Sequence, residues 1–169
     1  MINDGAHLGS SILTDHEIRW LVQRFDEIPS RDFYSILAAR VAVFVVEQDC
    51  PYQDVDGLDF EAVHVTARSA NGGVLAYARI LPPGLRFAEP SIGRVLTVMP
   101  ARGKGLGREL MHYSLEAAGK CFPGQPLRIS AQQYLERFYT DLGFETVRGP
   151  YPEDGIPHLE MFRPATSEQ

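Results

Sequence analysis

The fold of this chain is decided by Val95–Leu110, VLTVMPARGKGLGREL, in which three glycines and three basic side chains separate two apolar segments. The first segment belongs to IGRVLTV, residues 92–98, which predicts a strand that ends before Pro100. The second predicts a helix over residues 105–120, because its apolar residues recur on one helical face. A strand that leads through glycines into a helix directs backbone N–H groups and a helix N-terminus at one point. The stretch therefore predicts a binding site for a pyrophosphate.

Two known nucleotide-binding motifs are also rich in glycine, but neither fits this turn. A P-loop needs a serine or threonine after its lysine to hold magnesium, whereas Lys104 is followed by Gly105. A dinucleotide-binding turn needs G-x-G-x-x-G and an acidic residue about 20 positions further on. Here the glycines are Gly103, Gly105 and Gly107, and the next strand, LRISAQ, carries no such acid. From these residues alone, the remaining alternative is an ordinary tight turn whose basic side chains are solvated.

The rest of the chain alternates strand and helix patterns. Ser30 is a candidate N-cap for a helix over residues 31–47. VHVTARS and GVLAYARIL predict two strands joined by an Asn-Gly-Gly hairpin turn at residues 71–73. LRISAQ predicts a strand, YLERFYTDLG a short helix and HLEMFRP a final strand, while EIRWLVQRF fits either a strand or a helix. Together these patterns predict one mixed α/β domain.

The composition is typical of a single-domain protein. The chain has 169 residues, 44% of them hydrophobic, which is enough for one domain. We expect this domain to span residues 17–169, and we expect residues 1–16 to form a flexible tail. A net charge of -6 argues against nucleic acid as a partner. Cys50 and Cys121 have neither zinc-type nor disulfide-type spacing, and no metal site is expected. No apolar run approaches the roughly 18 residues that span a membrane, so we expect a cytoplasmic protein with no membrane partner.

Several sequence strings, taken together, resemble a known family. The loop RGKGLG at residues 102–107, followed by an apolar helix and by FYTDLGF at residues 138–144, resembles the GNAT superfamily of acetyl-CoA-dependent N-acetyltransferases. RVAVFVVEQDCPYQDVDGLD, AYARIL and YPEDGIPHLEM, in this order, resemble the ElaA-like branch of that superfamily. The resemblance implies an α/β (α+β) fold with a mixed, mostly antiparallel central sheet flanked by helices. It also implies a first strand near residues 17–24 and a V-shaped splay between the strands that end near Val98 and Gln132.

The same resemblance implies how the chain binds acetyl-CoA as its cosubstrate. The splayed strand end is expected to hold the pantetheine arm, and the glycine-rich loop is expected to hold the pyrophosphate. The residues expected to bind the coenzyme are Leu96, Thr97, Val98, Arg102, Gly103, Lys104, Gly105, Leu106, Gly107, Arg108, Gln132 and Tyr139. Gln132 stands where many members of the superfamily have asparagine, and it carries the same carboxamide on a longer stem.

Acetyl transfer needs a donor for the thioester oxyanion, an acid for the departing thiolate and a base for the amine. The resemblance implies that the backbone amide of Val98, expected to be unpaired, is the donor to the oxyanion. It also implies that the phenol of Tyr139 is the acid for the thiolate. Spacing alone favours Tyr139 as a core aromatic, because apolar residues share its helix. The candidate bases are Glu47, His64 and His158, and Glu47 is the one assigned to catalysis. The alternative is that the amine loses its proton through water to bulk solvent, without a protein base.

An acidic segment that follows residue 47 is the expected acceptor side of the site. Its carboxylates form either a solvated loop or an electronegative rim that attracts a cationic amine, and Tyr52 offers an aromatic face to such a cation. The candidate acceptor-binding residues are therefore Glu47, Tyr52, Asp56 and His158. A calcium-binding loop is not expected, because the ligand spacing does not reach a glutamate at the twelfth position.

The sequence thus leads to the hypothesis of an acetyl-CoA-dependent N-acetyltransferase that acetylates a primary amine of a small molecule, protein or peptide. Transfer is expected to be direct, because no cysteine stands where an acetyl-enzyme would be expected to form. The alternative is an acyl-CoA-binding sensor or interaction module without turnover. The family resemblance also leaves a homodimer open.

Overall fold

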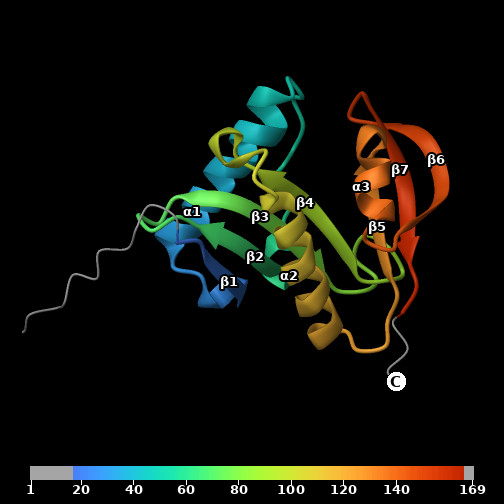
Figure 1. The fold of residues 1–169 in the computed structure, drawn as a ribbon, viewed down its shortest axis with the longest axis horizontal. Helices are drawn as coiled ribbons and strands as arrows, with labels where there is room; N and C mark the ends of the chain where they lie inside the picture. The colour runs from blue at the N-terminus through green and yellow to red at the C-terminus, as the bar shows by residue number, and fades with distance from the viewer. Residues whose placement is uncertain (1–16, 166–169) are drawn as a thin grey trace, which may run out of the picture.

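The computed structural model describes residues 17–165, so the tail expected at residues 1–16 lies outside the described residues, as do residues 166–169. Residues 17–165 form a seven-stranded sheet in the order β1-β2-β3-β4-β5-β7-β6 (Figure 1). All neighbouring strands pair antiparallel except β4 and β5, which pair parallel. The predicted mixed, mostly antiparallel sheet is therefore confirmed.

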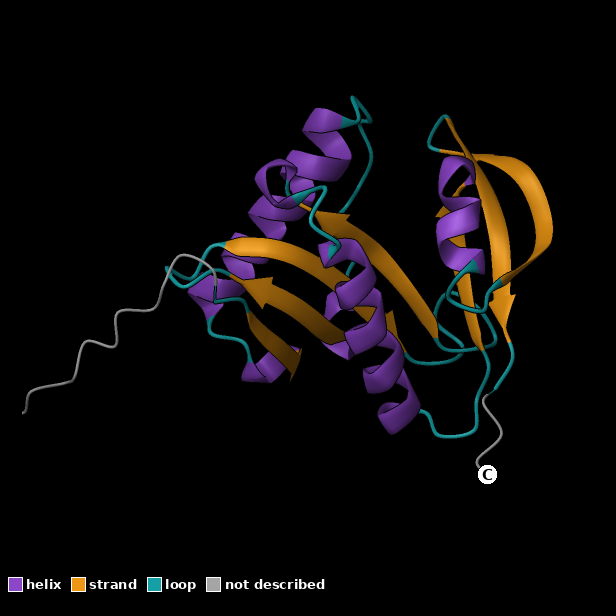
Figure 2. Cartoon of the chain, viewed as in Figure 1, coloured by secondary structure: helices purple, strands orange, loops and turns teal. Residues whose placement is uncertain are grey.

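The helices and strands alternate along the chain, as the sequence patterns predict (Figure 2). The strands are β1 (Arg19–Arg24), β2 (Val63–Arg68), β3 (Val74–Leu81), β4 (Ser91–Thr97), β5 (Leu127–Gln132), β6 (Glu145–Glu153) and β7 (Ile156–Arg163). The α-helices are α1 (Ser30–Arg40), α2 (Leu106–Cys121) and α3 (Glu136–Thr140). Short helical turns are η1 (Phe25–Glu27), η2 (Val41–Glu47), η3 (Leu58–Glu61), η4 (Met99–Ala101) and η5 (Gln133–Leu135).

The sheet opens between β4 and β5. These strands pair at a single position, Ser91 with Arg128, and then diverge (Figure 1). The pairing of β4 with β3 shifts in register between Tyr77 and Arg79, and Arg94 in this part of β4 has a φ of 52°. A bulge of this kind bends a strand and increases its local twist. The V-shaped splay predicted between these two strands is therefore present, with an irregularity in β4 beside it.

Helices α1 and α2 cover opposite faces of the part of the sheet that contains β2, β3 and β4. Alternate residues of β3 point to opposite faces because a strand has a period of two. Ala76 and Ala78 belong to the core cluster that contains Leu110 of α2. Tyr77, between them, belongs to the cluster that contains Ile36 of α1. This two-sided packing holds β3 and β4 in place on one side of the V.

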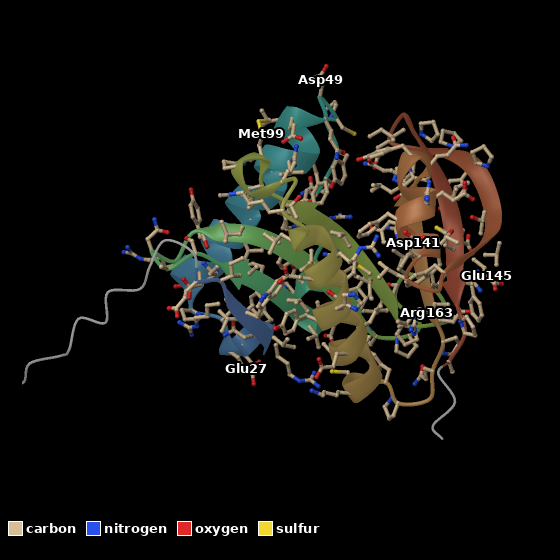
Figure 3. The ribbon with its side chains drawn as sticks, viewed as in Figure 1. Glu27, Asp49, Met99, Asp141, Glu145 and Arg163 are labelled. Carbon is tan, nitrogen blue, oxygen red and sulfur yellow. The ribbon has the colours of Figure 1, made fainter. Side chains whose placement is uncertain are left out.

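The helix predicted over residues 31–47 is present, but it has two parts. The first part, α1, begins at Ser30 with Pro29 in the capping position, so Ser30 is not the N-cap. The second part, η2, is a π-helix, a wider turn that is frequent at functional sites. Its end brings the chain to the open end of the V, where the side chains of Asp49 and Met99 point outward (Figure 3).

Strand β6 has no counterpart in the sequence prediction. Its sequence, ETVRGPYPE, contains two prolines and one glycine, and it is exposed along most of its length. It lies at the edge of the sheet and pairs with β7, a position in which a strand tolerates proline. The missing apolar alternation follows from this exposure, because neither face of the strand is fully buried.

Candidate functional site

The glycine-rich loop presents a row of free backbone amides. Gly103 and Gly105 have φ values of 76° and 79°, a left-handed conformation that glycine adopts without strain. Within the described chain the amides of residues 103–107 donate to no protein acceptor, whereas the amide of Arg102 donates to Met99 O at 3.2 Å. Unpaired N–H groups at a helix N-terminus favour the binding of an anion, and the pyrophosphate site at this loop stays a prediction.

The basic side chains of this loop differ in their partners. Arg102 donates to both carboxylate oxygens of Glu47, at 2.6 and 3.0 Å. Arg108 lies 3.4 Å from Asp141. Lys104 is exposed, and no carboxylate of residues 17–165 pairs with it. Lys104 is therefore the loop cation that is free to meet an added phosphate.

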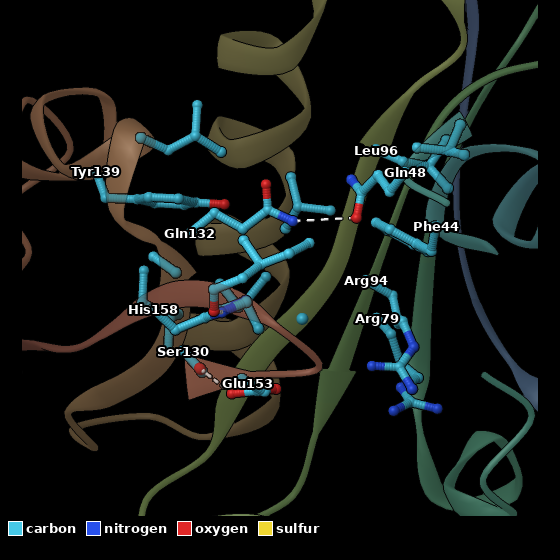
Figure 4. Close-up of a pocket in the computed structure, with 18 of the residues that line it drawn as sticks. Phe44, Gln48, Arg79, Arg94, Leu96, Ser130, Gln132, Tyr139, Glu153 and His158 are labelled. Carbon is cyan, nitrogen blue, oxygen red and sulfur yellow. Dashed lines mark hydrogen bonds between the residues drawn. The ribbon is translucent and has the colours of Figure 1, made fainter. Parts of the chain in front are cut away.

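A cavity of about 440 Å³ lies where β4 and β5 diverge (Figure 4). Thr97 and Gly107 line it beside the glycine-rich loop, and Gln132 and Tyr139 line it on the side of β5. Its other polar lining residues are Glu47, Gln48, Cys50, Tyr52, Arg79, Arg86, Ser91, Arg94, Arg102, Ser130, Tyr134, Glu153, Asp154 and His158. The cavity thus joins half of the residues expected to bind the coenzyme to several expected on the acceptor side.

The backbone amide of Val98 is not available as an oxyanion donor. It donates to Leu75 O at 3.0 Å, so the expectation that it is unpaired is wrong. Thr97 pairs with Ala76. Its N–H and C=O groups point to the side opposite those of Val98, because successive residues of a strand turn these groups to opposite sides. The Thr97 carbonyl accepts a hydrogen bond from Arg102 Nε at 3.0 Å, which agrees with this direction. Thr97, rather than Val98, turns its backbone toward the V.

Tyr139 lies in the cavity wall with its hydroxyl pointing toward the interior (Figure 4). The residue is 6% exposed, and its ring packs edge-on against Phe138 and Phe144. Burial raises the pKa of the phenol, so it is protonated at neutral pH. No group of the described residues accepts a hydrogen bond from its hydroxyl. Tyr139 therefore belongs to the core and also offers a free donor to the cavity.

Side-chain hydrogen bonds link the two sides of the V. Gln132 Nε2 donates to Gln48 Oε1 at 3.2 Å (Figure 4), and Cys50 Sγ donates to Asp154 O at 3.3 Å. Gln48 and Cys50 follow η2, whereas Gln132 ends β5 and Asp154 lies in the turn between β6 and β7. The two sides of the V are thereby linked into one site, and the Cys50 thiol within it is a hydrogen-bond donor.

Glu47 is held as an anion rather than free to act as a base. The hydrogen bond from Arg102 and the charge of that guanidinium lower the pKa of Glu47. A carboxylate with a lowered pKa is a weaker base than usual. The structure therefore brings Glu47 to the cavity but pairs it with the glycine-rich loop.

The acidic segment is neutralised from inside the protein. Asp56 accepts two hydrogen bonds of 2.7 Å from Arg79, and Asp54 lies 2.8 Å from Arg94. The Arg94 guanidinium also lies 5.3 Å from the centre of the Tyr52 ring, so the aromatic face expected for a substrate cation meets an arginine instead. The expected electronegative rim at Asp56 is therefore not formed, and of these two candidates only Tyr52 lines the cavity.

These ion pairs belong to a buried network that includes Arg40. Arg40 is fully buried and donates to Asp54 at 2.9 Å and to Asp59 at 2.6 Å. Burial opposes the ionisation of Asp56, but the hydrogen bonds and charge of Arg79 outweigh it and lower the pKa of Asp56 to about 2. Because the network joins α1, the acidic segment, β3 and β4, it supports one wall of the cavity.

The two histidine candidates have opposite environments. His64 is fully buried, and its ring nitrogens contact Tyr77 Oη at 2.8 Å and Asp59 O at 3.0 Å. Burial lowers the pKa of His64, and the side chain does not reach the cavity. His158 lines the cavity, and its Nδ1 lies 2.7 Å from Ile156 O. His64 is therefore a core residue, whereas His158 remains a candidate.

Several cavity residues were missed from the sequence. They are Gln48, Arg79, Arg86, Arg94, Ser130, Glu153 and Asp154. Ser130 Oγ donates to Glu153 Oε2 at 2.6 Å and lies 2.7 Å from Tyr151 Oη. Ser130 precedes Gln132 by two residues and so shares its face of β5, a spacing that identifies it once the strand is known. Glu153 has no such local signal, because it lies on the unpredicted β6.

Within the part of the chain that the structure describes, no helix is long and apolar enough to cross a membrane. The same range contains no cluster of three or more histidine, cysteine or acidic side chains placed to hold a metal ion.

Comparisons with known proteins agree with this fold. The family described as "Acetyltransferase (GNAT) domain" matches residues 88–163. The chain is 43% identical over 145 residues to a UPF0039 protein of Synechocystis sp., covering 86% of this chain and 94% of that protein. It is 40% identical over 148 residues to Protein ElaA of Escherichia coli, covering 86% of this chain and 96% of ElaA.

Two solved structures give the same result. A crystal structure of an acyl-CoA N-acyltransferase from Pseudomonas aeruginosa is 40% identical, with a TM-score of 0.83 over 87% of this chain and 99% of that one. The crystal structure of Escherichia coli ElaA is 38% identical, with a TM-score of 0.82 over 87% of this chain and 99% of that one.

Proposed function

The chain belongs to the ElaA-like branch of the GNAT acetyltransferases, an acyltransferase family, and from this premise we propose that it transfers acetyl from acetyl-CoA directly to a primary amine. The observation that carries the proposal is the row of unpaired amides at residues 103–107, which adjoins a cavity between splayed strands. Such amides bind a pyrophosphate. The acceptor is an amine of a small molecule, protein or peptide that enters from the opposite side of the V.

The donor is proposed to lie along the splayed edge of β4. The amides of residues 103–107 and the Lys104 ammonium bind its pyrophosphate, because neither has a protein partner within residues 17–165. The pantetheine arm follows Leu96 and Thr97 toward the carboxamide of Gln132, all of which line the cavity. This arrangement brings the thioester to the centre of the cavity, between Thr97 and Tyr139.

The proposed reaction forms one C–N bond and breaks one C–S bond. The lone pair of a neutral amine attacks the thioester carbonyl carbon, and the resulting oxyanion accepts a hydrogen bond from the amide of Thr97. The C–S bond then breaks, and the sulfur leaves with the electron pair. The nitrogen loses one proton and the sulfur gains one through the hydroxyl of Tyr139. The products are an N-acetylated amine and coenzyme A with a free thiol.

Calorimetry with acetyl-CoA tests the donor site. Gly105→Trp fills the space before the amides with an indole, and the expected result is loss of binding. Gly119→Trp is the matched control, because Gly119 is exposed on α2 and open space surrounds its position. Circular dichroism checks that both variants are folded. Equal affinity in wild type and Gly105→Trp contradicts the pyrophosphate assignment.

A thiol-release assay with aliphatic amines, peptides and polyamines tests the transfer itself. The expected result is release of coenzyme A above the rate of thioester hydrolysis for at least one class of amine, together with an acetylated product detected by mass spectrometry. Tight binding of acetyl-CoA with no turnover across the panel would favour an acyl-CoA-binding sensor instead.

A further inference from the structure

The acceptor half of the cavity contains a histidine whose catalytic role is unassigned. The inference that follows rests on the proposed function, because it concerns how the acceptor amine loses its proton. His158 lies on β7, opposite Gln132 of β5 and opposite Tyr151 of β6. It therefore stands at the end of β5 where the sheet opens, on the same side of the V as Tyr139 (Figure 4).

One ring nitrogen of His158 is occupied and the other is free. Nδ1 lies 2.7 Å from Ile156 O, and a carbonyl oxygen can only accept, so the hydrogen-bond network assigns the ring hydrogen to Nδ1. In the neutral ring Nε2 then carries a lone pair and no hydrogen. No group within residues 17–165 donates to Nε2. A neutral imidazole in this tautomer is ready to accept a proton.

An aromatic ring and a carboxylate lie near the His158 ring. Tyr151 stacks on its ring, with 6.4 Å between ring centres. Burial opposes the ionisation of Glu153, but a hydrogen bond from Ser130 and the positive charges of Arg86 and His158 lower its pKa. The Glu153 carboxylate is thus an anion on the same side of the V as His158, and both residues line the cavity.

Of the other charged and titratable groups near this part of the cavity, all but Asp154 are paired or neutral, and no cation of residues 17–165 pairs with the Asp154 carboxylate. These groups are Tyr52, Arg79, Arg94, Tyr139, Asp154 and Glu160. Arg79 and Arg94 are paired with aspartates, and Glu160, two residues along β7 from His158, accepts a hydrogen bond from Arg128 at 2.5 Å. The wall opposite His158 therefore carries paired rather than free cations.

The remaining candidate bases are engaged. Glu47 is bound at both oxygens by Arg102, and both ring nitrogens of His64 have partners in the core. Glu153 uses one oxygen for Arg86 and the other for Ser130, each at 2.6 Å. Among these candidates, within the described residues, only His158 keeps a ring nitrogen with no hydrogen-bond partner in the cavity.

We propose that His158 is the general base of the acetyl transfer. Its Nε2 accepts a proton from the ammonium group of the acceptor, and the amine nitrogen keeps the lone pair with which it attacks the thioester. The imidazolium then releases that proton to solvent, so the step needs no further reactant. The acceptor is accordingly an aliphatic primary amine that arrives protonated, since an aromatic amine or a hydroxyl has no such proton to lose at neutral pH.

The test compares His158→Gln with His112→Gln, which alters an exposed histidine on α2 outside the cavity. The measurements are kcat/KM for the best amine as a function of pH, with saturating acetyl-CoA, and the Kd of acetyl-CoA by calorimetry. For His158→Gln we expect a loss of about 10²- to 10³-fold at neutral pH and an unchanged Kd. We also expect the loss to shrink at high pH, where the free amine is abundant. His158→Ala should regain activity when imidazole is added.

The outcomes separate this role from the proposed function. Turnover of His158→Gln within about threefold of wild type, with the same acidic limb of the pH profile, would overturn the role of His158 and leave the proposed function intact. A loss of acetyl-CoA affinity as large as the loss of kcat/KM, without rescue by imidazole, would also overturn the role of His158 as base. Such a result would indicate that His158 has a structural role. Absence of turnover in wild type, with acetyl-CoA bound, would overturn the proposed function and this role together.

Discussion

Replacing Asp56 by asparagine should remove a charge from the buried network while it preserves the shape of the side chain. In the wild type, Asp56 accepts two hydrogen bonds of 2.7 Å from Arg79, whose side chain is 2% exposed. In the variant, Arg79 keeps an anionic partner in Asp59, at 3.1 Å. The arginine is then only partly compensated, and folding should become less favourable.

The size of the effect follows from the pKa of Asp56, which falls from an ordinary 3.8 to about 2. A lowered pKa in the folded state stabilises the fold above pH 3.8, and this contribution is lost as the pH falls through about 2. At about 1.4 kcal/mol for each pH unit, the contribution is roughly 2 kcal/mol at pH 7 and about 1 kcal/mol at pH 3. The 3–5 kcal/mol typical of breaking a fully buried pair is an upper limit here, because the Asp56 side chain is 22% exposed.

Urea unfolding of wild type and Asp56→Asn at pH 7 and pH 3 measures both values. Asp26→Asn is the control, since Asp26 is exposed and belongs to none of these ion pairs. The free energy of unfolding of Asp56→Asn should lie below that of wild type by roughly 2 kcal/mol at pH 7 and by about half as much at pH 3. Equal stabilities at pH 7, or a difference that does not shrink at pH 3, would refute the reasoning.

Three further substitutions probe the site. Tyr139→Phe should lower kcat by about 10²-fold and leave the fold and the Kd of acetyl-CoA unchanged, because the hydroxyl has no protein partner; a weaker Kd alone would contradict this. Glu47→Gln should tighten acetyl-CoA binding about two- to fivefold by removing an anion beside the loop. The variant should keep the acidic limb of the pH profile of kcat/KM, and loss of that limb would restore Glu47 as the base. Gly149 has a φ of 119°, and an added Cβ would lie 2.9 Å from His158 O. Gly149→Ala should therefore destabilise the protein by about 1–3 kcal/mol in thermal unfolding and lower turnover. A melting temperature equal to that of wild type would contradict this prediction.

The glycine-rich loop and its two flanking elements could be predicted because their information is local. Positive φ values at Gly103 and Gly105 require glycine, and a helix N-terminus leaves its first amides unpaired whatever surrounds it. The strands and helices with a buried face could be predicted for a similar reason, since burial imposes a period on the sequence. Strand β6 could not, because an exposed edge strand carries no such period.

The partner of each polar side chain could not be predicted in this way. The sequence shows a run of carboxylates after residue 47, but the arginines that neutralise Asp54 and Asp56 come from α1, β3 and β4, between 14 and 40 positions away. Val98 failed as the oxyanion donor for a related reason. The direction of a backbone amide depends on the register between two strands, and the register of β4 against β3 shifts near Arg94.

The mixed α/β order of elements, the glycine-rich turn at residues 102–107 and, through the resemblance, the family could all be predicted from the sequence alone. Those features depend on residues that are neighbours in the chain. The folded chain turns Thr97 toward the V, pairs Glu47 with Arg102 and, within residues 17–165, leaves one ring nitrogen of His158 without a partner. Each of these depends on contacts between distant segments, because packing decides which hydrogen-bonding groups are satisfied inside the protein and which are left for a substrate.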